Sequence, residues 1–347
     1  MLTRRRILLV LSYLITVTLC FLLGHWDRIG ADCYYFERLI TEPIVRCFYR
    51  SCLTVFIHQA IYHVLRPFDV IPWYAIAISS SLAGAGYLFV LWRFSTSPLF
   101  WVLNVSAGCV WVFFGHVENY AWVNFFLILS VYELREYHLG RQPIWKASAA
   151  YFAAIASHHL AIFYLPGYLY YFRGRSLDDR DRVGIFLPLT VASLFLVVTP
   201  LVLKTEGIDV GFDRLVPWIS LWAKNHYFLI FSVDHLRMLA FFHGVAAPFG
   251  VPFLSLVLIL LYRWYLRDRY LGALAVMVGC GVFWMTFWHP DWGYRDWDLF
   301  SQFGLLANLL AGLVLVQEEL QGQDLKQKSL CESPGDDCAG QQAAQAE

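Results

Sequence analysis

Long apolar runs recur along the whole chain and constrain its fold more than any other feature. The first spans Ile7–Gly24, and others lie near 70–92, 98–115, 119–133, 147–172, 184–203, 238–262, 270–288 and 299–316. A helix needs about 20 apolar residues to cross the hydrocarbon core of a bilayer. Charged residues make up only 15% of the chain, against roughly 25% in soluble domains. The sequence therefore predicts an all-α polytopic membrane protein.

The run that begins at Ile7 is expected to be an uncleaved membrane span. It is longer than the usual apolar region of a signal peptide, and no small-x-small cleavage site follows it. Arg4, Arg5 and Arg6 precede it, which places the N-terminus in the cytoplasm, because cytoplasmic loops carry an excess of Lys and Arg.

The run at 147–172 is ambiguous, because it contains His158 and His159 near its middle. It forms either one long helix or two short helices that fold back at the histidines. Two short helices give about ten transmembrane helices and place most of the 26 Lys and Arg residues in the cytoplasm. A single helix would reverse the membrane orientation of every later segment, and fewer Lys and Arg residues would then lie in the cytoplasm. The positive-inside rule therefore favours two short helices.

With ten spans, the polar stretches between the runs all face away from the cytoplasm. They surround Asp32, Glu118, His158, Asp234 and Asp298. The cytoplasmic loops are short and basic, with both termini on that side. This segregation predicts one polar cavity that opens outward. The net charge is zero, and nothing in the composition indicates a nucleic-acid partner.

The first extracytoplasmic loop, about 25–69, is expected to contain helices that lie in the membrane interface. One amphipathic pattern places Val45, Phe48, Cys52, Val55 and Phe56 on a single apolar side. The chain beyond Gln317 is polar and rich in Gln, Gly and Ala, which predicts a disordered cytoplasmic tail. The expected organisation is a transmembrane domain at 1–316 and a tail at 317–347.

The stretch GHVENYAW places His116, Glu118 and Asn119 between two apolar runs. Ionisable groups at membrane depth are energetically expensive and usually functional. His116 and Glu118 could share a proton, bind a sugar or bind a metal. The structural alternative is a helix cap combined with an interfacial anchor.

The stretch HPDWGYRDWDLFS is a second polar interruption, placed before the last apolar run. Arg295 offers a planar fork suited to phosphate or carboxylate. Trp297 can stack on a sugar or sit in the interfacial aromatic belt. The alternative for the stretch, including Asp296 and Asp298, is a structural network that locks the last two spans.

Two further sites have functional and structural interpretations. Asp32, after the first span, can accept a proton or hold a divalent cation, or it is a solvated loop acid. A protonated His158 or His159 would suit a phosphate, and the alternative is a packed, hydrogen-bonded pair.

No cofactor is indicated with certainty, a divalent cation is possible, and the HExxH zinc signature is absent.

This arrangement resembles the GT-C superfamily of membrane glycosyltransferases. It is similar, more narrowly, to bacterial family 39 relatives of the protein O-mannosyltransferases and the RgtA/B/C/D-like group. The matching stretches are GAD at Gly30–Asp32, TEP at Thr41–Pro43, GHVENYA at Gly115–Ala121, SHHLAIFYLP at Ser157–Pro166 and RDWDLFS at Arg295–Ser301. Many family 39 members have an Asp-Glu pair in the first loop, whereas Cys33 follows Asp32 here, and no large soluble C-terminal domain follows.

The resemblance implies transfer of a sugar from a polyprenyl-phosphate donor to an acceptor hydroxyl on the extracytoplasmic side of a bacterial plasma membrane. The acceptor could be a glycan, a lipid or a protein. The resemblance implies catalytic roles for Asp32, Glu118 and Asp298, with Asp32 as the proton acceptor. It implies substrate contacts for Glu42, His116, Asn119, His158, His159, Arg295, Asp296 and Trp297.

Other classes of protein remain open on the sequence alone. A transporter also uses charges within the membrane, but it commonly shows repeated halves with broken spans, and no internal repeat is evident. A membrane acyltransferase would also present His and Asn. A structural scaffold explains the many outward-facing ionisable groups poorly.

Overall fold

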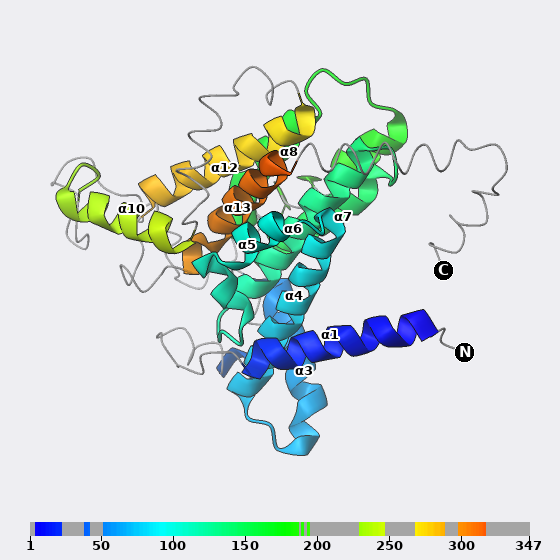
Figure 1. The fold of residues 1–347 in the computed structure, drawn as a ribbon, viewed down its shortest axis with the longest axis vertical. Helices are drawn as coiled ribbons and strands as arrows, with labels where there is room; N and C mark the ends of the chain where they lie inside the picture. Colours follow the sequence, from blue (N-terminus) through cyan, green and yellow to red (C-terminus); the bar gives the residue numbers. More distant parts are fainter. Residues whose placement is uncertain are drawn as a thin grey trace.

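A computed structural model describes residues 4–22, 38–41, 51–186, 189–190, 193–194, 229–246, 268–288 and 298–316. Figure 1 shows the bundle that these residues form. Its α-helices are α1 (Arg4–Leu22), α3 (Cys52–Leu65), α4 (Pro72–Phe94), α5 (Pro98–Val105), α6 (Tyr120–His138), α7 (Ile144–Ser157), α8 (Leu165–Tyr171), α10 (Val233–Ala246), α12 (Arg269–Phe287) and α13 (Ser301–Leu315). Short 3₁₀ helices are η2 (Arg66–Phe68), η3 (Gly108–Phe113) and η4 (His159–Tyr164).

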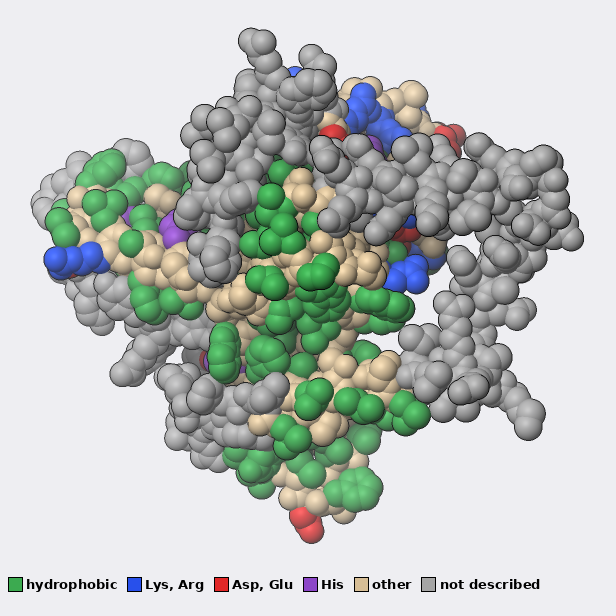
Figure 2. All heavy atoms as spheres, viewed as in Figure 1, with side chains coloured by type: hydrophobic (Ala, Val, Ile, Leu, Met, Phe, Trp, Pro, Cys, Tyr) green, Lys and Arg blue, Asp and Glu red, His purple; other side chains and the backbone are tan. Residues whose placement is uncertain are grey.

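Three of the described helical segments are long and apolar enough to cross a membrane. They are Pro72–Phe94, Arg269–Phe287 and Asp298–Leu315. Pro72 lies in the first turn of its helix, where a missing backbone N–H costs nothing. On the face drawn in Figure 2, hydrophobic side chains cover the middle of the described bundle. The protein is therefore an integral membrane protein, as the apolar runs predicted.

The ambiguous run at 147–172 folds back on itself, which confirms the prediction of two short helices. Helix α7 ends at Ser157, and His158 is extended, with φ −162° and ψ 129°. The Ser148 hydroxyl lies 2.7 Å from the Tyr168 hydroxyl, and the rings of Tyr151 and Tyr168 stack with centroids 4.8 Å apart. In one continuous helix, Ser148 and Tyr168 would be about 30 Å apart. The contacts therefore require a hairpin.

The apolar run at 98–115 is not one helix, contrary to its expected role as a span. It divides into α5, which ends at Val105, and η3, which begins at Gly108. A Cβ atom on Gly108 would lie 2.2 Å from the carbonyl oxygen of Val245 in α10. Only glycine allows this close approach, so the break in the run coincides with a tight contact with α10, where apolar periodicity alone predicts continuity.

Helix α3 confirms a helix in the first loop but corrects its expected apolar side. Its buried residues are Thr54, Val55, His58 and Gln59, whereas Phe56 is about half exposed. The buried face is thus mostly polar. Val45 and Phe48 of the same expected side lie outside the described residues. The difference arises because α3 packs against α4 and α7, and its Thr54 hydroxyl donates to the Ser157 carbonyl oxygen of α7.

Charged and aromatic groups gather at one end of the bundle, which we call the basic end. There Arg93 donates to the Tyr132 hydroxyl at 3.2 Å, and Tyr137 donates to Asp181 at 2.5 Å. The Arg175 guanidinium lies 5.1 Å from the centre of the Tyr137 ring. Figure 2 shows Lys and Arg side chains grouped near the upper end of the described surface. Among the described residues expected in the site, His116 and Glu118 precede the start of α6 and Asp298 precedes the start of α13, so they lie at the opposite end.

Candidate functional site

The segment from His116 to Asn119 directly precedes α6 and contains three of the residues expected in the site. Gly115 has φ 73°, a left-handed conformation that glycine adopts without steric cost. The turn redirects the chain from η3 toward α6. The Ser80 hydroxyl of α4 then donates to the His116 carbonyl oxygen at 2.7 Å. Backbone geometry and one side-chain bond therefore fix where His116 lies.

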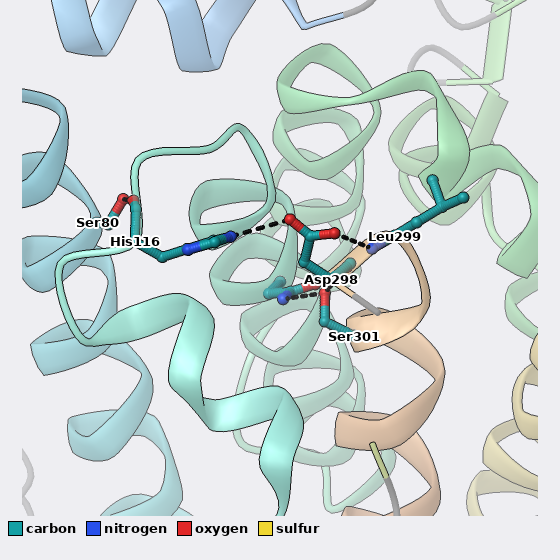
Figure 3. A network of polar contacts seen from close by, with 6 residues as sticks. Ser80, His116, Asp298, Leu299 and Ser301 are labelled. Atoms are coloured by element: carbon teal, nitrogen blue, oxygen red, sulfur yellow. Dashed lines mark hydrogen bonds and ion pairs between the residues drawn. The ribbon is translucent and has the colours of Figure 1, made fainter. Parts of the chain in front are cut away.

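His116 and Asp298 meet although 182 positions separate them. Nε2 of His116 lies 2.9 Å from Oδ2 of Asp298, and the two side chains point toward one another in Figure 3. The other carboxylate oxygen, Oδ1, accepts from the backbone N–H of Leu299 at 3.0 Å. Both carboxylate oxygens of Asp298 therefore have a partner: the His116 side chain for one, and the backbone N–H just before α13 for the other.

Below this pair, two more side chains join α6 to α13. Asn124 Nδ2 donates to the Ser301 hydroxyl at 2.9 Å, and that hydroxyl donates to the Asp298 carbonyl oxygen at 2.5 Å. Asn124 and Ser301 are fully buried. This short network fixes the start of α13 against α6, so Asp298 is held from its backbone as well as from its carboxylate.

Glu118, Asn119 and His158 are buried around the start of α6. Glu118 is 8% exposed and Asn119 5% exposed. The His158 ring lies 5.3 Å from the Tyr120 ring and stacks on His159 at 4.7 Å. Nδ1 of His158 accepts from the Leu160 N–H at 3.2 Å. The break between α7 and η4 therefore lies beside the start of α6.

Helix α3 packs against the end of α7, next to His158. The Thr54 hydroxyl donates to the Ser157 carbonyl oxygen at 2.9 Å. His58, one turn further along α3, is fully buried. Burial lowers the pKa of His58 to about 3, and a hydrogen bond with the Glu118 backbone opposes that shift. His58 is therefore a neutral imidazole at physiological pH.

The structure brings together part of the predicted site. We call the end of the bundle that holds His116, Glu118, Asn119, His158 and Asp298 the polar end, and His159 stacks at its edge. The residues Asp32, Glu42, Arg295, Asp296 and Trp297 lie outside the described residues. The expectation that Asp32 approaches Glu118 and Asp298 stays a prediction.

Sequence reasoning missed His58, Ser80, Asn124 and Ser301. Their polarity within otherwise apolar helical patterns was the available signal, because a buried polar side chain needs a partner. The sequence offered no means of telling which partner each would meet.

The described residues include no group of three or more His, Cys, Asp or Glu side chains placed to hold a metal ion. The carboxylates and imidazoles that do meet form pairs, as at His116 and Asp298. An ionised carboxylate only accepts hydrogen bonds, so the His116 tautomer that carries its proton on Nε2 fits this contact.

Comparison with known proteins yields a structural likeness. No family model and no curated protein sequence matches the chain. The structure is similar to the crystal structure of ArnT from Cupriavidus metallidurans in the apo state, with TM-score 0.53 and 14% identity. The match covers 94% of this chain and 62% of the ArnT chain, so the chain spans about three fifths of that protein.

At this level of identity the likeness shows the fold alone. The chain is an all-α polytopic membrane protein with the GT-C-like fold of ArnT, which confirms the expected fold class. The narrower likeness to family 39 rests on sequence stretches only.

Proposed function

We propose that the protein is a membrane glycosyltransferase that moves a sugar from a polyprenyl-phosphate donor to an acceptor hydroxyl. The observation that carries this proposal is the contact between the partly buried His116 and the buried Asp298, which lies with buried Glu118 and Asn119 at one end of an ArnT-like bundle. Buried ionisable groups at a membrane edge are expensive and favour a functional role. The apolar bundle around them suits a lipid-linked substrate.

The roles of the site residues follow from chemistry and from the resemblance. Asp32 accepts the proton of the acceptor hydroxyl. Arg295, with His158 or His159, stabilises the phosphate that leaves with the lipid. Glu118 and Trp297 position the sugar, and Glu42 and Asp296 contribute further substrate contacts. Asp298, the third expected catalytic carboxylate, also orients His116 through its 2.9 Å contact with Nε2.

The two ends of the bundle support the proposed orientation. Arg135, Arg141, Arg175 and Arg182 accompany the basic end, and cytoplasmic loops carry such residues in excess. The polar end then faces away from the cytoplasm. Nucleotide sugars are absent there, so the donor must be lipid-linked.

One experiment tests both function and orientation. A short-chain, water-soluble polyprenyl-phosphate hexose with a radiolabelled sugar is supplied to sealed right-side-out and inverted vesicles that contain the protein. We expect label to enter membrane-bound product in right-side-out vesicles only, and not in vesicles lacking the protein. Incorporation in inverted vesicles alone would reverse the orientation, and no incorporation in either preparation would refute the function.

A further inference from the structure

Asn124 is a polar residue on an otherwise apolar buried stripe of α6. The stripe recurs every three to four residues, at Ala121, Asn124, Leu127, Ile128 and Val131. Asn124 is fully buried, and its Oδ1 has no hydrogen-bond partner among the described residues. An unpaired buried acceptor lowers stability, and a leucine with the same branching would avoid this cost. Packing alone therefore does not explain an asparagine at this position.

The amide of Asn124 makes one bond, and that bond leads to Asp298. Nδ2 of Asn124 donates to the Ser301 hydroxyl at 2.9 Å, and the hydroxyl donates to the Asp298 carbonyl oxygen at 2.5 Å. In Figure 3, Ser301 and Asp298 lie together at the start of α13, and the Asp298 carboxylate points toward His116. The bonds from α6 therefore fix the backbone from which this carboxylate projects.

The same turn of α6 is also bonded to α4. Nε1 of Trp122 donates to the Ser79 hydroxyl at 2.8 Å, and the adjacent Ser80 donates to the His116 carbonyl oxygen at 2.7 Å. One turn of α6 is thus joined to α4 beside the bond that holds His116, and to α13 beside Asp298. The distance between the imidazole and the carboxylate is therefore set from α6 on both sides.

We infer that Asn124 is a positioning residue for Asp298, that it acts through Ser301, and that it supports sugar transfer without contact with the substrate. The inference rests on the proposed function, in which Asp298 is a catalytic carboxylate. A misplacement of about 1 Å can slow an enzyme by about 10²-fold, whereas a hydrogen bond between helices of a membrane protein contributes little to stability. Loss of the Asn124 amide should therefore affect turnover more than stability.

The first test replaces Asn124 by leucine in the full chain. Asn124→Leu removes one bond and one unpaired acceptor together, and Ser301 keeps its bond to Asp298, so Tm should stay within about 2 °C of wild type. The kcat for transfer should fall by about tenfold, with the KM of the donor unchanged. A wild-type kcat would overturn the inference. A fall of more than about 5 °C in Tm together with the loss of kcat would also overturn it, because it would indicate a structural role.

Ser148→Ala is the matched control. Like Ser301, Ser148 is a buried hydroxyl with one side-chain partner and one backbone carbonyl partner, the Tyr168 hydroxyl and the Ile144 carbonyl oxygen. It lies at the contact between α7 and α8, away from Asp298. Its Tm should fall, and its kcat should match wild type.

A second test does not depend on transfer. Ser301→Ala and Asp298→Ala are made singly and together, and the loss of Tm in the double variant is compared with the sum of the single losses. If Ser301 positions Asp298, the double variant should lose at least about 2 °C less than the sum, because residues in one network do not act additively. Ser148→Ala combined with Asp298→Ala should be additive.

Additive losses for Ser301→Ala and Asp298→Ala would overturn the inference. Absence of transfer by the wild type would refute the proposed function instead. The comparison of Tm values would then still decide whether Ser301 positions the Asp298 carboxylate.

Discussion

Replacing Asp32 by asparagine should lower the turnover of sugar transfer by about 10²–10⁴-fold, the usual size of general-base catalysis. Asparagine has nearly the same shape but does not accept a proton at neutral pH. The Kd of the donor should change little, because the donor phosphate is bound by other groups. Single-turnover transfer and donor binding, measured on the same preparations, separate the two quantities.

Arg295→Ala supplies the contrast. Removing this guanidinium takes away a charge-assisted partner of the phosphate, so the donor should bind more weakly and transfer should also slow. Full activity of Asp32→Asn would remove the assignment of Asp32 as the proton acceptor. Equal loss of expression and folding in both variants would favour a structural role for both residues.

Asp298→Ala should both destabilise the protein and slow transfer. It removes the acceptor of the His116 Nε2 contact and of the Leu299 N–H, and both groups are partly buried, so the loss should be near the lower end of the range of about 1–3 kcal/mol for a buried group left unpaired. The catalytic efficiency should fall by about 10–100-fold, because His116 loses the bond that fixes its ring and tautomer. Thermal unfolding and kcat/KM measure the two effects. Asp298→Asn, which retains one oxygen acceptor, should lie between wild type and Asp298→Ala.

Asp179→Ala is the matched control for this prediction. Asp179 also pairs with a basic residue, at 3.3 Å from Arg182, but its side chain is exposed, and exposed pairs contribute little to stability. Its Tm and kcat/KM should match wild type. Identical Tm values for Asp298→Ala and Asp179→Ala would contradict the contact between His116 and Asp298.

The sequence predicted the features of this fold that depend on local composition. The apolar run near 70–92 forms α4. The distribution of Lys and Arg residues correctly favoured a hairpin at His158. The break of the run at 98–115 could not be predicted, because it depends on the approach of Val245 to Gly108. Such a contact is tertiary, and apolar periodicity contains no information about it.

The same limit explains which parts of the site were found. His116, Glu118 and Asp298 stood out because polar residues interrupt apolar runs there. Their meeting could not be inferred, since a gap of 182 positions leaves the relative placement to packing. His58 was hidden because amphipathic periodicity assigns polar residues of an interface helix to water, whereas α3 turns that face toward α7.

The most direct measurement is mass spectrometry of the lipids that co-purify with the protein in mild detergent. An unrelated membrane protein from the same membranes serves as the background. A polyprenyl-phosphate glycosyltransferase should retain polyprenyl phosphate or its sugar conjugate well above that background, because the lipid is both its donor and its product. Enrichment of acyl-thioester products instead, or of neither lipid, would contradict the account and indicate acyl transfer or transport.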